Sequence, residues 1–247
     1  MRRIEILNCP MDVATMDETV AAIHQAVLDD KFTQHVVVNV AKLINMREDA
    51  TLRNSVCSCD IINIDGMGVV FGARFLGYKA IQRIAGIDLF YELLKISETE
   101  KLPIYLLGAK ESTLQSTVSN IKNSYPEIII SGYHHGYFWE NEEAVVDAIK
   151  KSGAKLLFVA ITSPKKENFI NKWSTQLGVS FVMGVGGTFD VVSGEVKRAP
   201  IWMQNYGLEW FYRVIQEPKR MWKRYLITNT KFLALILREK IRLSLKR

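Results

Sequence analysis

The stretch IINIDGMGVV, Ile61 to Val70, runs from a short apolar segment into one aspartate, Asp65, and then into two glycines and more apolar residues. A short apolar run that ends at a turn signal is typical of a strand buried on both faces. The residues from Gly68 onward predict a short helix. The stretch therefore predicts a strand, a loop and a helix, with a carboxylate where the strand ends.

The same alternation continues along the chain. Apolar, β-branched runs predict five further strands, and segments with helical spacing predict the helices between them. The predicted strands are His35 to Val40, Ile61 to Ile64, Ile104 to Ala109, Glu127 to Tyr133, Lys155 to Ile161 and Ser180 to Gly186. The predicted helices cover 41–56, 68–77, 86–100, 111–125, 141–153 and 163–177. This pattern predicts an α/β fold with a mostly parallel, Rossmann-like sheet flanked by helices.

Composition fits a folded α/β protein. The 247 residues are 48% hydrophobic and 23% charged, which excludes a disordered chain. The three cysteines, Cys9, Cys57 and Cys59, lack the C-x-x-C spacing of zinc and redox sites, so we expect reduced thiols. The amino terminus carries no apolar segment of signal-peptide length, and export is not expected.

The carboxyl-terminal part is strongly basic. From Arg213 onward the chain has eleven Lys and Arg and two Glu, so this segment has a net charge of +9. The whole chain has a net charge of +6, so residues 1–212 carry −3. We divide the chain into an α/β core, residues 1–200, and a helical appendage, residues 201–247.

The appendage mixes aromatic and aliphatic residues with its cations. Its late apolar run, Phe232 to Leu237, is far shorter than the about 18–20 residues that span a bilayer. A helical wheel places Lys231, Arg238, Arg242 and Lys246 on one side and Phe232, Leu233, Ile236, Leu237 and Leu243 mostly on another. This pattern favours a helix on an anionic membrane surface. A nucleic-acid site and a solvated helix packed on the core are the alternatives.

Ligands of open α/β sheets bind beyond the carboxyl ends of the strands. The residues to inspect there are Asn39, Asp65, Gly108, Tyr133 to Tyr137, Thr162 to Glu167 and Gly184 to Asp190.

Asp65 has four explanations. A dinucleotide-binding G-x-G-x-x-G loop fails because Phe71 stands in the third glycine position. A metal role lacks support, because the chain has no D-x-D pair. Two explanations stay open: a cap for the following helix and a general base for a substrate hydroxyl.

Three other motifs each allow a ligand-binding explanation and a structural one. GVGGTFD, Gly184 to Asp190, allows backbone N–H groups to approach a phosphate, or forms a tight turn. TSPKKE, Thr162 to Glu167, offers an anion site at a helix start, or a plain cap. Arg83 is either a phosphate clamp or a surface arginine. His134 and His135, adjacent in sequence, are expected to point apart as loop residues.

Taken together, the segments resemble the WecG/TagA/CpsF family of bacterial glycosyltransferases. The matching motifs are NIDGMGVV, RIAGIDLF, YLLGA, GYF, SPKKE, GVGGTFDVVSGEVKRAP and GLEWFYRVIQEPKR. They follow the family's order from about Asn39 to Arg224. The resemblance implies an inverting transferase that needs no metal or other cofactor. Its donor would be a UDP-sugar and its acceptor a polyprenyl-diphosphate-linked sugar at the cytoplasmic face of the membrane.

The resemblance also implies roles for individual residues. Asp65 falls on the proposed base, and Asn39 would orient the sugar or acceptor. The donor site would include Arg83, Gly108, Tyr137, Lys166, Glu167, Gly186, Gly187 and Asp190. Arg213, Arg220 and Arg224 would come from the appendage to the diphosphate. The family further implies peripheral membrane attachment through residues 213–247, self-association, and no nucleic-acid partner.

Two positions depart from the family pattern. Lys166 replaces a common glutamine, which would suit a uronate or an extra phosphate contact, and Val37 replaces a frequent threonine. The sugar expected is N-acetylmannosamine or its uronic acid. The alternatives are glucose transfer from UDP-glucose and a non-catalytic nucleotide-binding protein recruited to the membrane.

Overall fold

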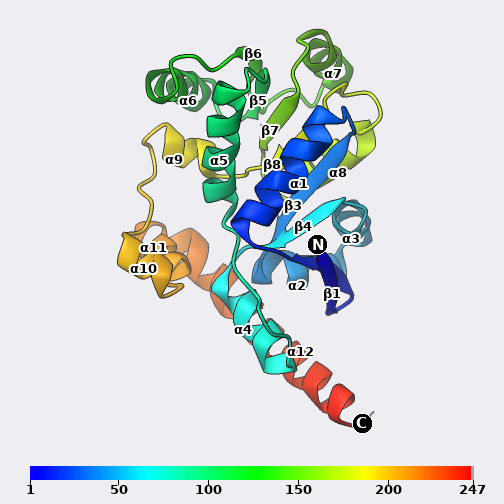
Figure 1. The fold of residues 1–247 in the computed structure, drawn as a ribbon. Coiled ribbons are helices and arrows are strands. Elements are labelled where there is room, and N and C mark those ends of the chain that lie inside the picture. Colours follow the sequence, from blue (N-terminus) through cyan, green and yellow to red (C-terminus); the bar gives the residue numbers. More distant parts are fainter. Residues whose placement is uncertain (246–247) are drawn as a thin grey trace.

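The computed structural model describes residues 1–245, except for the side chain of Arg220. Six parallel strands form one sheet in the order β4-β3-β8-β7-β5-β6. The strands are β3 (Thr33–Val38), β4 (Ile61–Ile64), β5 (Ile104–Gly108), β6 (Ile130–His134), β7 (Leu156–Ala160) and β8 (Phe181–Gly184). The predicted α/β fold with a parallel sheet is confirmed (Figure 1).

Helices follow the strands and cover both faces of the sheet. They are α1 (Met16–Leu28), α2 (Val40–Glu48), α3 (Ala50–Cys57), α4 (Met67–Leu76), α5 (Gly86–Thr99), α6 (Glu111–Ser124), α7 (Glu142–Lys151), α8 (Lys165–Trp173) and α9 (Thr188–Val192). Residues alternate along β5, β7 and β8 between two cores. On β5, Leu106 joins the core with α1, α5 and α6, while Leu107 joins the core with α7 and α8.

Two parts of the core differ from expectation. The predicted helix over 41–56 is interrupted at Asp49, whose extended backbone ends α2 and whose side chain caps α3 by accepting from Leu52 N at 2.9 Å. An antiparallel hairpin of β1 (Arg2–Ile6) and β2 (Cys9–Val13) precedes α1 and was not predicted. Its two-residue turn has Leu7 and Asn8 at positive φ.

The appendage contains α10 (Ile201–Asn205), α11 (Glu209–Gln216) and α12 (Pro218–Ser244). Figure 1 shows α12 (red) running beside α4 (cyan) and away from the sheet. Phe232 and Ile236 of α12 are buried in the core that α2, α3 and α4 share with the hairpin. A Cβ at Gly72 of α4 would lie 2.7 Å from Phe232 Cζ, so glycine permits this close packing.

The apolar side of α12 is divided between core and solvent. Phe232 and Ile236 are buried, whereas Leu233 and Leu237 from the same predicted face are 63% and 54% exposed. Of residues 1–245, no helix has both the length and the apolar character needed to cross a bilayer.

Candidate active site

The strand order sets how the predicted site residues lie along the carboxyl edge of the sheet. Asp65 follows β4 and Asn39 follows the neighbouring β3. The glycine loop follows β8, the next strand, and Lys166 and Glu167 begin α8 after β7. Gly108 ends β5, and Tyr137 follows β6 at the far edge. The sheet therefore brings the first groups together and separates Tyr137 from Asp65 by four strands.

Asp65 and Asn39 lie side by side. Val38 pairs with Ile64 across the two strands, and Asp65 N donates to Val38 O at 2.9 Å. A Cβ at Gly66 would lie 3.5 Å from Asn39 Cβ. Asn39 caps α2, with its Oδ1 accepting from Lys42 N at 3.0 Å. Asp65 and Asn39 thus lie together where β4 and β3 end.

Asp65 does not cap the following helix. The residue at the N-cap of α4 is Gly66, with φ of +118°, and that helix start has no side-chain cap. The Asp65 side chain is instead 27% exposed and accepts from Arg83 Nε at 3.3 Å. The capping explanation is therefore wrong, and the carboxylate faces a guanidinium and solvent.

Arg83 connects Asp65 to the appendage. The bond from Ile84 N to Ile64 O fixes the backbone of the next residue, and Arg83 Nη2 donates to Glu209 of α11. Glu209 Oε1 also lies 3.4 Å from Arg198 Nε, and Arg198 makes two bonds to Asp88 of 2.5 and 2.9 Å. Arg83 is thus a bridging residue with 16% of its side chain exposed, not a free surface arginine.

Two appendage arginines act electrostatically on Tyr225 of α12. Burial raises the pKa of the Tyr225 hydroxyl, and the carboxylates of Asp65 and Glu209 add to this shift. The cations Arg213 and Arg224 oppose it, so the charges of both appendage arginines act on Tyr225. The side chain of Arg220 lies outside what the structure describes.

A buried charge cluster lies beneath the glycine loop. Lys42 Nζ is 2.7 Å from Glu167 Oε1, and Lys166 Nζ is 3.4 Å from the same oxygen. Burial alone would raise the pKa of the Glu167 carboxyl, but Lys42 and Lys166 outweigh it and lower this pKa to about 2. Burial lowers the pKa of Lys166.

The Lys166 side chain runs along the glycine loop. A Cβ at Gly184 would lie 2.5 Å from Lys166 Cε, and one at Gly186 would lie 3.6 Å from its Nζ. Gly186 has φ of +55°, and a Cβ at Gly187 would be 3.4 Å from Asp190 Oδ2. The glycines of this loop therefore leave room for the Lys166 side chain, most clearly at Gly184.

Gly108 has a structural explanation. Its φ is +125°, and a Cβ there would lie 2.3 Å from Ala160 O on β7. Ala109 N donates to the same carbonyl at 2.9 Å. Glycine at this position allows the backbones of β5 and β7 to meet where the strands end.

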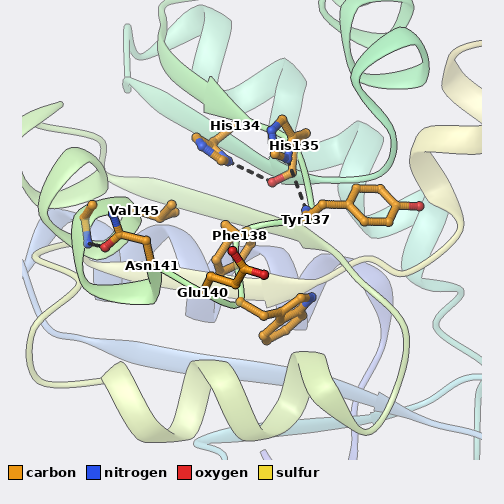
Figure 2. Close-up of a pocket in the computed structure, with 9 residues that line it drawn as sticks. His134, His135, Tyr137, Phe138, Glu140, Asn141 and Val145 are labelled. Atoms are coloured by element: carbon orange, nitrogen blue, oxygen red, sulfur yellow. Dashed lines mark hydrogen bonds between the residues drawn. The ribbon is translucent and has the colours of Figure 1, made fainter.

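The far edge holds a separate cavity of about 540 Å³ (Figure 2). It is lined by His134, His135, Tyr137, Phe138, Trp139, Glu140, Asn141, Ala144 and Val145. The His134 and His135 rings lie 4.4 Å apart between centroids, so the expectation that they point apart is wrong. Tyr137 is 66% exposed and points away from the other labelled side chains.

Sequence reasoning did not single out Lys42, Asp88, Arg198 or Glu209. Arg198 and Glu209 lie inside the motifs GVGGTFDVVSGEVKRAP and GLEWFYRVIQEPKR, so the sequence already placed both residues in segments that resemble the family. Among the described residues, no three His, Cys, Asp or Glu side chains gather as a metal site would require.

Comparisons with known proteins agree on one family. The model of the "Glycosyl transferase WecG/TagA/CpsF family" matches residues 4–246. The chain is similar to the N-acetylglucosaminyldiphosphoundecaprenol N-acetyl-beta-D-mannosaminyltransferase of Bacillus subtilis strain 168, 40% identical over 182 residues, 74% of this chain and 70% of that protein. It is also similar to the protein of the same name from Bacillus spizizenii, 38% identical over 182 residues, 74% of this chain and 68% of that one. The family match across nearly the whole sequence, with these two relatives, shows that the chain belongs to the WecG/TagA/CpsF family of glycosyltransferases.

Proposed function

We propose that the protein transfers N-acetylmannosamine, or its uronic acid, from a UDP-sugar to N-acetylglucosamine on a polyprenyl diphosphate. The names of both relatives specify this acceptor and an N-acetyl-β-D-mannosaminyl product. The observation that carries the proposal is Asp65, a partly exposed carboxylate beside Asn39 that faces the appendage through Arg83.

The proposed mechanism uses Asp65 as general base. The carboxylate takes the proton of the acceptor hydroxyl while that oxygen forms a bond to the anomeric carbon. The bond from this carbon to the diphosphate oxygen breaks, and UDP leaves with the electron pair. Attack opposite the leaving group converts an α-linked donor to a β product, so the reaction inverts configuration.

The charge of the departing diphosphate must be neutralised as it develops. Arg83 of the core supplies a guanidinium group in contact with Asp65. Arg213 and Arg224 of the appendage, whose charges act on Tyr225 as that of Asp65 does, supply two more. We propose that these cations and the N–H groups of the glycine loop suffice without a divalent metal. The absence of a D-x-D motif supports this proposal.

We propose that the appendage attaches to the cytoplasmic face of an anionic membrane. Large apolar side chains are exposed on all three of its helices, including Trp202 on α10, Ile215 on α11 and Leu226 on α12. On α11 and α12 they are interspersed with Lys and Arg, as in interfacial helices. Flotation should bring the protein up with anionic liposomes but not with neutral ones. A stable dimer with these residues protected, and no flotation, would assign the surface to self-association instead.

The direct test is a donor panel. The protein is incubated with UDP-N-acetylmannosamine, its uronate, UDP-glucose or UDP-N-acetylglucosamine, together with a polyprenyl-diphosphate-N-acetylglucosamine analogue and EDTA. We expect UDP release with a mannosamine donor. UDP binding without transfer to any acceptor would favour the non-catalytic alternative, and turnover with UDP-glucose alone would favour glucose transfer.

A further inference from the structure

The Glu209 carboxylate lies between two arginines of the core. Arg83 comes from the segment before α5 and contacts one carboxylate oxygen, while Arg198 comes from the segment before α10 and lies 3.4 Å from the other. Between 16 and 24% of each of these three side chains is exposed. An appendage carboxylate thus occupies a partly buried site that the core lines with cations.

Each arginine is positioned by a second carboxylate of the core. Asp88 holds Arg198 through two hydrogen bonds, and Asp65 holds Arg83 through its Nε. Both guanidinium groups therefore stay in place if Glu209 leaves. Two fixed guanidinium forks that converge on one anion suit a group with several charged oxygens. A diphosphate meets that requirement better than a single carboxylate.

The helix that carries Glu209 is weakly held. None of the residues of α11 is buried, whereas α12 is anchored by buried Met221, Phe232 and Ile236. Withdrawal of Glu209 from the arginines would thus expose no buried apolar side chain of α11. The contact can open while α12 stays packed on α2 and α4.

We propose that Arg83 and Arg198 form the site for the diphosphate of the UDP-sugar, and that Glu209 occupies this site in the free protein until the diphosphate displaces it. The inference rests on the proposed function, which supplies the diphosphate. It adds Arg198 to the donor site and makes Glu209 an internal competitor. Because Arg83 also contacts Asp65, one guanidinium would connect the leaving group with the base.

Competition lowers the apparent affinity for UDP by the fraction of molecules in which the site is open. If Glu209 holds the site closed in about nine of ten molecules, removing its charge tightens binding about tenfold. A purely structural Glu209 gives the opposite sign, since loosening α11 would weaken any site that the appendage completes.

The experiment is titration calorimetry of UDP with the full-length wild-type protein and three variants. We expect Glu209→Gln to bind UDP about tenfold more tightly and Arg198→Gln at least about tenfold more weakly. The matched control is Glu48→Gln, which removes another ion pair between core and appendage, from the end of α2 to Lys231 of α12 at 2.6 Å. It should bind UDP as the wild type does. Unchanged or weaker binding by Glu209→Gln overturns the proposal, and so does unchanged binding by Arg198→Gln.

Inorganic pyrophosphate and UMP separate this inference from the proposed function. Glu209→Gln should tighten pyrophosphate binding and leave UMP binding unchanged. If sugar transfer occurs but Glu209→Gln binds neither UDP nor pyrophosphate more tightly than the wild type does, the proposed diphosphate site is wrong and the proposed transferase function stands. If pyrophosphate binding responds as expected but no donor is turned over, the site stands and the proposed function fails.

Discussion

Replacing Phe232 by alanine tests whether α12 is part of the folded core. The Phe232 side chain is 4% exposed and packs against α4, where a Cβ on Gly72 would lie 2.7 Å from the ring. Truncation of a buried phenylalanine costs about 3–5 kcal/mol. In a chain of this length, that loss corresponds to a fall in Tm of about 6–20 °C. Thermal unfolding followed by circular dichroism measures the change.

Leu233 provides the matched control. It is the next residue of α12 and is 63% exposed, so Leu233→Ala should change stability by less than about 0.5 kcal/mol and Tm by less than about 2 °C. Because Leu233 lies on the exposed side, its loss should instead weaken flotation with anionic liposomes. Equal melting temperatures for Phe232→Ala and Leu233→Ala would refute the packing of α12 on the core.

Three further predictions concern the site and its support. Lys166→Gln should change the ratio of kcat/KM for uronate and neutral donors by about tenfold. Lys165→Gln is the control, since the ammonium of Lys165 lies over Trp139, and it should leave this ratio unchanged. The same ratio in Lys166→Gln and the wild type would show that Lys166 does not select the donor. Burial lowers the pKa of His35 to about 4. As the pH falls, the His35 imidazole is therefore protonated in the unfolded chain before it is protonated in the folded protein. The unfolding free energy should therefore fall by up to about 1.4 kcal/mol per unit as pH drops from about 6.5 to 4, and a His35→Gln variant with the same slope in urea titrations would contradict this cause. Gly108→Ala should lower Tm and donor affinity together, because its Cβ would strike Ala160 O; an unchanged Tm would show that the strand ends can separate.

The sheet was predictable because its strands are short, apolar and bounded by turn residues. LLFVA in β7 and FVMG in β8 are entirely buried, so their composition carries the signal. The break at Asp49 was missed because apolar spacing continues across it. The hairpin and α1 were also missed, although Thr15 and Glu18 form a capping box whose T-x-x-E pattern was present in the sequence.

The site was only partly predictable. Polar residues after strands, such as Asp65 and Asn39, could be found because parallel strands end at one edge. The link from Asp65 through Arg83 to Glu209 could not, because Arg83 and Glu209 are 126 residues apart and meet only through the packing of the appendage. The same holds for Lys42 and Glu167, whose contact depends on β3 and β7 both lying beside β8. Periodicity also could not divide the apolar side of α12 between core and surface.

The most direct measurement of the proposed chemistry is the turnover rate of Asp65→Asn with the donor identified by the panel. Asparagine has nearly the shape of aspartate but cannot accept the acceptor's proton. We predict a fall in kcat of about 10²–10⁴ with UDP still bound and Tm near the wild-type value. A variant that keeps the full rate would contradict the assignment of Asp65 as the base.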